Sequence, residues 1–138
     1  MKMIIDADGC ILGRIAAYAS KQALQGDEVV VVNSEKAFIT GRRQNIFARY
    51  IEMRQKGKHM KMKGPLFPTL PEKIMKRTVR GMLKYNEGRG KIAFKKIKCY
   101  SGVPGSCMNV KGISICRRKE EIKGITLAEL SKFLRGGQ

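Results

Sequence analysis

Apolar positions in the first quarter of the chain follow two patterns, one typical of buried strands and one typical of an amphipathic helix. Short apolar runs occur at Met3–Asp6 and at Val29–Val32, and the second is a continuous run of valines, as in strands that are buried on both faces. Between these runs, apolar residues recur at helical spacing. They are Leu12, Ile15, Ala16, Ala19 and Ala23. Gly26 follows at the expected C-cap, so the sequence predicts a βαβ unit and an α/β fold.

The middle of the chain predicts two further helices. The first opens at Thr40-Gly41 and runs to about Lys56, with one broad apolar face. That face comprises Ile46, Phe47, Tyr50, Ile51 and Met53. The second begins at Pro71, the first helical position that proline favours. Its apolar half comprises Ile74, Met75, Val79, Met82 and Leu83.

The last third of the chain predicts shorter elements. Gly88–Lys91 breaks the helical pattern, Ile97–Tyr100 is expected to form a third strand, and Gly112–Cys116 a short fourth one. Thr126 and Glu129 form a capping box before a C-terminal amphipathic helix. No linker or repeat divides the chain. We therefore expect one domain over residues 1–138, with a central, mostly parallel sheet flanked by helices.

Charge changes this picture, because it is large and uneven. The chain has 138 residues and a formal net charge of +18. Residues 36–98 hold nineteen basic and three acidic side chains, whereas residues 1–35 hold three basic and five acidic ones. So concentrated a positive charge is expected to bind a phosphate-rich partner. Residues 36–98 are the predicted binding segment.

The helix that begins at Pro71 carries the clearest binding surface, since no acid interrupts its basic half. The long loop from Gln55 to Pro71 adds further lysines, and we expect its stretch Lys56–Phe67 to be mobile in the free protein and ordered on RNA. The candidate RNA-binding residues of the whole segment are Arg42, Arg43, Arg49, Lys56, Lys58, Lys61, Lys63, Lys73, Lys76, Arg77, Arg80, Lys84, Arg89 and Lys91.

Motifs for enzyme or metal chemistry are weak. Gly9–Arg14 joins a strand to a helix, but it matches neither the dinucleotide-binding nor the Walker pattern, so a tight turn is the favoured interpretation and a mononucleotide site the alternative. Asp6 and Asp8 suit a turn better than a Mg²⁺ site. His59 stands among lysines and methionines without a nucleophile at a recognisable spacing. No catalytic residue, metal, cofactor or small-molecule substrate is expected.

Cysteine spacing also argues against metal. Cys10, Cys99, Cys107 and Cys116 include no CxxC pair, so we expect reduced, mostly buried thiols rather than a zinc site. The acidic Asp6 comes too early for the apolar core of a signal peptide to form. No apolar run approaches the ~20 residues that a membrane span needs. The expected compartment is the cytoplasm.

The expected nucleic acid is folded RNA. Aromatic residues make up 7% of the chain and tryptophan is absent, so stacking on single strands is not the expected main mode. No helix-turn-helix or zinc-finger signature supports reading of DNA sequence. A basic helix, a basic loop and glycines that admit close approach to phosphate suit RNA recognised by its shape.

Several motifs resemble a known family. In chain order they are Gly13–Ala16, Val29–Glu35, Ile39–Gly41, Lys63–Pro65, Val79–Leu83 and Lys98–Gly102. Over residues 3–104 the chain is similar to the large-subunit ribosomal protein L13 (uL13) family. The short connection Leu24–Glu28 resembles the archaeal-type form.

This resemblance implies an α/β fold with a central parallel sheet, binding to 23S-type rRNA, neighbouring large-subunit proteins as partners, and a role in subunit assembly. Lys84 departs from the family pattern, which has proline after Val79–Leu83, and the tail 106–138 matches weakly. The alternatives are an RNA-modifying or nucleotide-dependent enzyme on an α/β scaffold and a free-standing DNA-binding protein.

Overall fold

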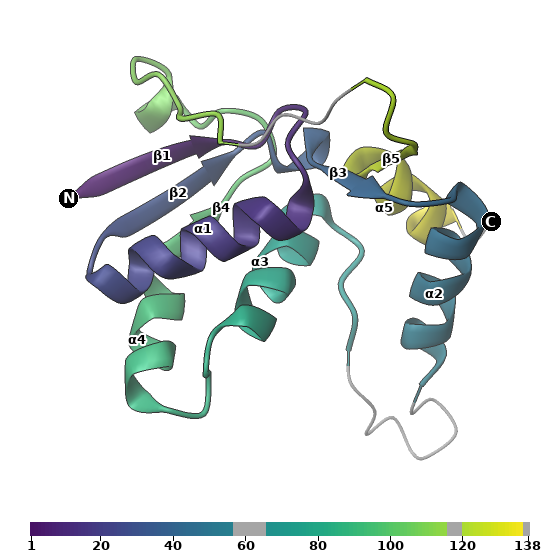
Figure 1. The fold of residues 1–138 in the computed structure, drawn as a ribbon, viewed down its shortest axis with the longest axis horizontal. Coiled ribbons are helices and arrows are strands. Elements are labelled where there is room, and N and C mark those ends of the chain that lie inside the picture. Colours follow the sequence, from purple (N-terminus) through teal and green to yellow (C-terminus); the bar gives the residue numbers. More distant parts are fainter. Residues whose placement is uncertain (57–65, 116–119, 137–138) are drawn as a thin grey trace.

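The larger sheet has three parallel strands in the order β1–β2–β4 (Figure 1). The computed structural model describes residues 1–56, 66–115 and 120–136. The strands are β1 (Lys2–Asp6), β2 (Glu28–Val32) and β4 (Ile97–Cys99), and Val29 pairs with Met3 on one side and Ile97 on the other. The valine run is therefore the central strand and its valines are all buried, as its sequence predicts.

Three helices cover one face of this sheet. They are α1 (Leu12–Gln25), α3 (Pro71–Met82) and α4 (Gly88–Lys96). Ile5, Val31 and Ile97 point into the resulting core and are fully buried. The opposite face is covered by the segment that includes the short helix η2 (Gly105–Cys107), whose Cys107 packs with Ile4, Val30 and Val32. The predicted α/β fold is confirmed, and the three α-helices that pack on this sheet lie on one side of it.

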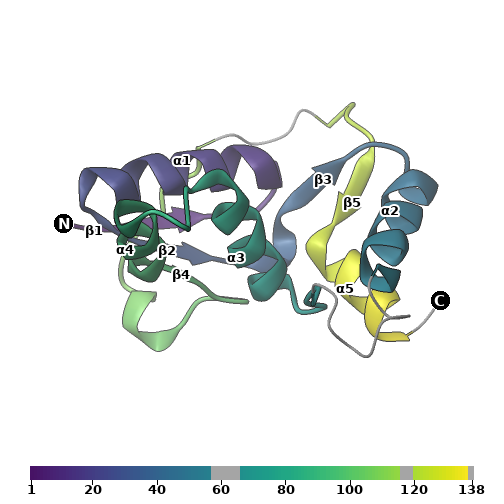
Figure 2. The ribbon, with the colours of Figure 1, turned by 90° about the horizontal axis from the view of Figure 1, so that it is seen from below.

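A second, two-stranded antiparallel sheet lies beside the first (Figure 2). It pairs β3 (Phe38–Thr40) with β5 (Gly124–Thr126) and carries α2 (Arg43–Gln55) and α5 (Leu127–Gly136). The rings of Phe47 on α2 and Phe133 on α5 stack with centroids 4.1 Å apart. Sequence patterns missed both strands, because three residues are too few to establish an alternation.

Helix α3 joins the two parts of the fold. It packs against α1 and β4 on one side and against α5 on the other, and also against the short helix η1 (Ser34–Lys36). One hydrophobic cluster runs through both parts, from Ile5 and Val31 to Leu127 and Leu130. In the part of the chain that the structure describes, no helix is long and apolar enough to cross a membrane.

Several predicted boundaries are wrong. Gly88–Lys91 does not interrupt helical structure but begins α4, where the buried Gly90 packs against the Lys84 carbonyl without room for a Cβ. Ile113 makes an isolated parallel bridge to Ile5 instead of a fourth strand. Its backbone exchanges hydrogen bonds with β1, from Asp6 N–H at 3.0 Å and to the Ile4 carbonyl at 2.9 Å.

Two predicted core residues are exposed. Ile51 has 37% of its surface exposed, because it lies on the far side of α2 from the buried Ile46. Met82, the last residue of α3, is 45% exposed and borders a surface hollow beside Ala17 and Leu24 of α1. The predicted capping box is supported by the hydrogen bond that the Glu129 N–H donates to Thr126 Oγ1 at 3.3 Å.

Candidate nucleic-acid interface

The described candidate cations lie on or beside three helices rather than on one helix alone. Seen from below (Figure 2), α4, α3 and α2 follow one another along the long axis of the molecule. Lys58, Lys61 and Lys63 lie outside the described residues, and so does most of the loop that we expect to be mobile. The other eleven candidates are described, and all but Lys76 and Arg77 are exposed.

Lys76 corrects the predicted basic face of α3. Its ammonium donates to the carbonyl oxygen of Phe94 at 2.8 Å and also to that of Ile97, and it lies 4.2 Å from the centre of the Phe94 ring. Burial lowers the pKa of Lys76 below its usual value. The last carbonyls of a helix have no partner within it, so Lys76 satisfies the end of α4. Helical spacing on α3 alone cannot reveal this, because the partners come from another element.

Arg77 and Arg80 are supported by aromatic rings. The Arg77 guanidinium lies 4.0 Å from the centre of the Phe67 ring and donates to the Leu66 carbonyl at 3.2 Å. The Arg80 guanidinium lies 4.3 Å from the centre of the Tyr85 ring. A guanidinium held flat on a ring keeps N–H groups at its edge, where they can bind a phosphate in bidentate fashion. The sequence predicted both arginines but not their rings.

Lys84 lies just beyond α3, which ends at Met82, rather than on its basic face. Three of the candidate cations that the structure describes form exposed ion pairs. The pairs are Arg43–Glu129 at 3.5 Å, Lys56–Glu52 at 3.7 Å and Lys84–Glu87 at 3.5 Å. Exposed pairs of this kind contribute little to stability and are screened by salt. A polyanion can therefore compete for these cations at small cost to the fold.

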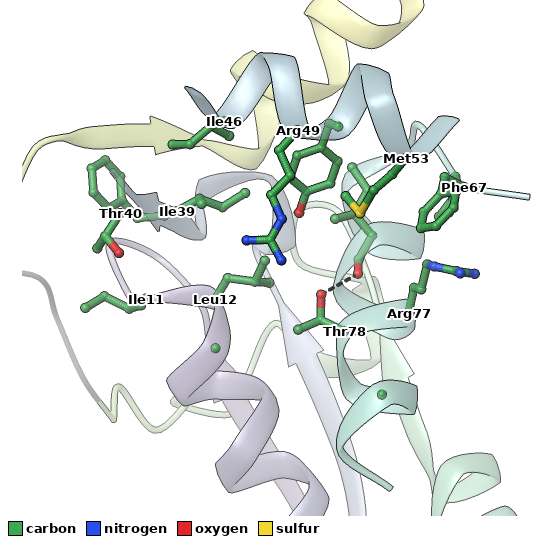
Figure 3. Close-up of a pocket in the computed structure, with 16 residues that line it drawn as sticks. Ile11, Leu12, Ile39, Thr40, Ile46, Arg49, Met53, Phe67, Arg77 and Thr78 are labelled. Carbon is green, nitrogen blue, oxygen red and sulfur yellow. Dashed lines mark hydrogen bonds between the residues drawn. The ribbon is translucent and has the colours of Figure 1, made fainter. Parts of the chain in front are cut away.

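Arg49 points into a cavity of about 650 Å³ (Figure 3). The cavity lies between the start of α1, β3, α2 and α3, and its walls are mostly apolar. The sequence predicted Arg49 as a binding residue but not the cavity, because five separate stretches of chain contribute to it.

A second group of lysines was missing from the predicted site. Lys2, Lys95, Lys96 and Lys98 border a hollow of about 490 Å³ beside Tyr100. The charge count of residues 36–98 already contained three of these lysines, but no helical or strand pattern set them apart. Lys96 also donates to the Gly26 carbonyl at 2.9 Å, which connects α4 to the end of α1.

The turn after β1 has a structural role. The Asp6 carboxylate accepts from Asp8 N–H at 3.0 Å and from the Asn33 side-chain amide at 2.9 Å, and Gly9 has φ +67°. This agrees with the favoured tight turn. Among the described residues, no group of three or more His, Cys, Asp or Glu side chains is placed to hold a metal ion.

The described cysteines are free thiols. Cys10 and Cys107 are buried, and Cys99 is partly buried on β4. Burial raises the pKa of Cys99 to about 12. Such a thiol stays protonated at neutral pH and is a poor nucleophile, so it does not resemble a catalytic cysteine. Cys116 lies outside the described ranges.

The α/β scaffold presents exposed cations on and beside three helices, with two arginines held on aromatic rings, an arrangement typical of proteins that bind polyanions. The family model for "Ribosomal protein L13" matches residues 1–106. The chain belongs to the ribosomal protein L13 family.

Archaeal relatives match nearly the whole chain, including residues beyond the end of the family model. "Large ribosomal subunit protein uL13" of Methanococcus maripaludis is 41% identical over 96% of each chain. The protein of that name from Archaeoglobus fulgidus is 41% identical over 95% of this chain and 86% of its own. The protein of that name from Methanocaldococcus jannaschii is 43% identical over 95% of this chain and 96% of its own. The tail after residue 106 is therefore largely shared with these relatives, although the family model ends there.

Proposed function

We propose that this protein is a structural constituent of the large ribosomal subunit, without enzymatic activity, that binds 23S-type rRNA and supports subunit assembly. Membership of the L13 family supports the proposal, since the relatives are named as large-subunit proteins. Its expected partners are rRNA and neighbouring large-subunit proteins, and its expected place is the cytoplasmic ribosome.

The observation that carries the RNA part of the proposal is the charge of residues 36–98 together with its placement. Lys73, Arg80 and Lys91 are exposed on or beside helices that face the same side of the molecule. RNA segments repel each other through their phosphates. Cations spread over such a surface neutralise this charge, so that the segments can lie close together. The Lys76 ammonium is committed to backbone carbonyls, so we assign it to the fold rather than to the RNA.

Co-sedimentation tests the proposal. A tagged full-length chain expressed in an archaeal host should migrate with the large subunit in a sucrose gradient, and high salt should release it. Excess duplex DNA should not displace it. A chain that stays at the top of the gradient at low salt would contradict a ribosomal role, and displacement by DNA would favour the DNA-binding alternative.

A further inference from the structure

The cavity beside Arg49 has the size and walls of a ligand site. Its volume of about 650 Å³ lies within the range typical of small-ligand pockets. Leu12, Ile39 and Met53 contribute apolar surface from three elements, and Tyr50 and Phe67 contribute aromatic rings. Figure 3 shows Leu12, Ile39, Met53 and Phe67 arranged around one space.

Arg49 is the unusual group in this cavity. Its side chain extends from α2 toward Leu12 and Thr78 (Figure 3). Within the described ranges, its guanidinium makes no hydrogen bond or ion pair, and no carboxylate lines the cavity. A guanidinium carries five donors in a planar fork, so the exposed Arg49 can bind anionic oxygens from a partner outside the chain.

Further polar groups lie at the cavity wall. The Thr78 hydroxyl donates to the Ile74 carbonyl at 3.0 Å, which leaves its oxygen free to accept a hydrogen bond. Arg77 lies across Phe67 at the rim, where a second cation is available. Thr40 and Tyr50 bring further hydroxyl groups to the wall, so the cavity combines apolar surface, hydroxyl groups and two arginines.

A nucleotide has this combination of properties, because its base is flat with apolar faces and its phosphate is anionic. Proteins that recognise RNA bind unstacked bases against aromatic rings or guanidinium planes. We propose that this cavity binds a single unstacked nucleotide of the bound RNA, with its base beside Leu12, Ile39 and Met53 and its phosphate on Arg49. The inference rests on the proposed rRNA-binding function and adds a specific site to it.

An apolar side chain from a neighbouring protein is the competing occupant. It would fill the same space, but it would make no use of the two arginines that line a site without a carboxylate. The charge of the cavity therefore favours the nucleotide.

Ultraviolet crosslinking of the full-length protein bound to large-subunit rRNA tests this assignment. Mass spectrometry should find one nucleotide crosslinked to the stretch that holds Tyr50 and Met53 or to Phe67. Arg49→Gln should reduce the yield of that crosslink about tenfold or more, the loss expected when a charge-assisted hydrogen bond is removed. Arg49→Lys, which keeps the charge, should retain part of it.

Arg43→Gln is the matched control, because Arg43 is an exposed arginine on the same helix but does not line the cavity. Compared at RNA concentrations that saturate both variants, Arg43→Gln should leave the cavity crosslink in place. Circular dichroism should show both variants folded. Equal crosslink yields in the two variants would overturn the assignment.

Other outcomes separate this inference from the proposed function. Normal RNA binding without a crosslink in the cavity would overturn the nucleotide site and leave the ribosomal role intact. A crosslink from the cavity to a protein in purified subunits would show that a protein segment occupies it. A crosslink to free AMP or UMP but none to RNA in the complex would also overturn the proposal, whereas absence of any RNA binding would contradict the proposed function itself.

Discussion

Neighbouring cations of α3 have opposite environments, which shows how much of a site is decided at the scale of single residues. Lys73 is exposed, whereas Lys76 is half-buried against the Phe94 ring and the end of α4. Both are lysines in the same basic run. The sequence identifies them as candidates together, but only the packing of α4 on α3 separates a side chain that can reach RNA from one that supports the fold.

Gly90 offers a test of this packing. Its position at the start of α4 leaves no room for a Cβ against the Lys84 carbonyl, so Gly90→Ala should lower the free energy of unfolding by about 1–3 kcal/mol. Gly88→Ala is the control, because a Cβ there meets nothing within 4 Å and alanine favours helix, so stability should hold or rise by up to about 1 kcal/mol. Urea unfolding followed by circular dichroism measures both. Equal stability of the two variants would show that α4 does not approach Lys84 this closely.

Cys99 predicts a pH dependence with a definite sign. Burial raises the pKa of its thiol from 9.0 to about 12, so between pH 9 and 12 the unfolded chain releases a proton that the folded chain retains. Stability should therefore fall as the pH rises through this window. Burial lowers the pKa of Lys76, which acts in the opposite direction, so the comparison is made against Cys99→Ala. Wild type should lose more stability than Cys99→Ala between pH 9 and pH 11, and parallel curves would exclude a buried thiol.

At the scale of elements, the sequence predicted what depends on long periodic runs. The βαβ unit and α3 follow from their apolar spacing, and Gly26 ends α1 in a left-handed conformation (φ +109°). A helix was also predicted to open at Thr40, but Thr40 belongs to β3 and α2 begins at Arg43. The three-residue strands β3 and β5 and the glycine-started α4 could not be found in this way. They depend on partners far along the chain, such as the pairing of Ile39 with Ile125.

Substitutions at two neighbouring residues of α3 test which side of this helix is exposed for binding and which side is buried in the core. Arg80 is exposed above Tyr85, so Arg80→Glu should change stability by less than about 0.5 kcal/mol while RNA affinity and incorporation into subunits fall. Val79 is fully buried, so Val79→Asp should destabilise the fold by on the order of 3 kcal/mol or more. Thermal unfolding and RNA binding are measured for both variants. A stable Val79→Asp protein beside an unfolded Arg80→Glu protein would contradict the orientation of α3.

At the scale of the whole molecule, charge predicted the partner class better than it predicted the site. The excess of cations in residues 36–98 follows from the sequence alone, and ring support for Arg77 and Arg80 refines it. The cavity beside Arg49 could not be predicted, because it forms only when α1, β3, α2 and α3 come together. Local sequence thus indicates which residues are cationic, and the fold determines which of them are available.

The dependence of RNA affinity on salt tests the central claim most directly. Each neutralised phosphate releases counterions, so the logarithm of the binding constant for a structured large-subunit rRNA fragment should fall linearly with the logarithm of KCl concentration. For contacts spread over three basic helices we expect a slope of about −4 or steeper, and a shallower one for Arg80→Glu. A flat plot for the wild-type protein would contradict the account that its basic helices bind RNA phosphates.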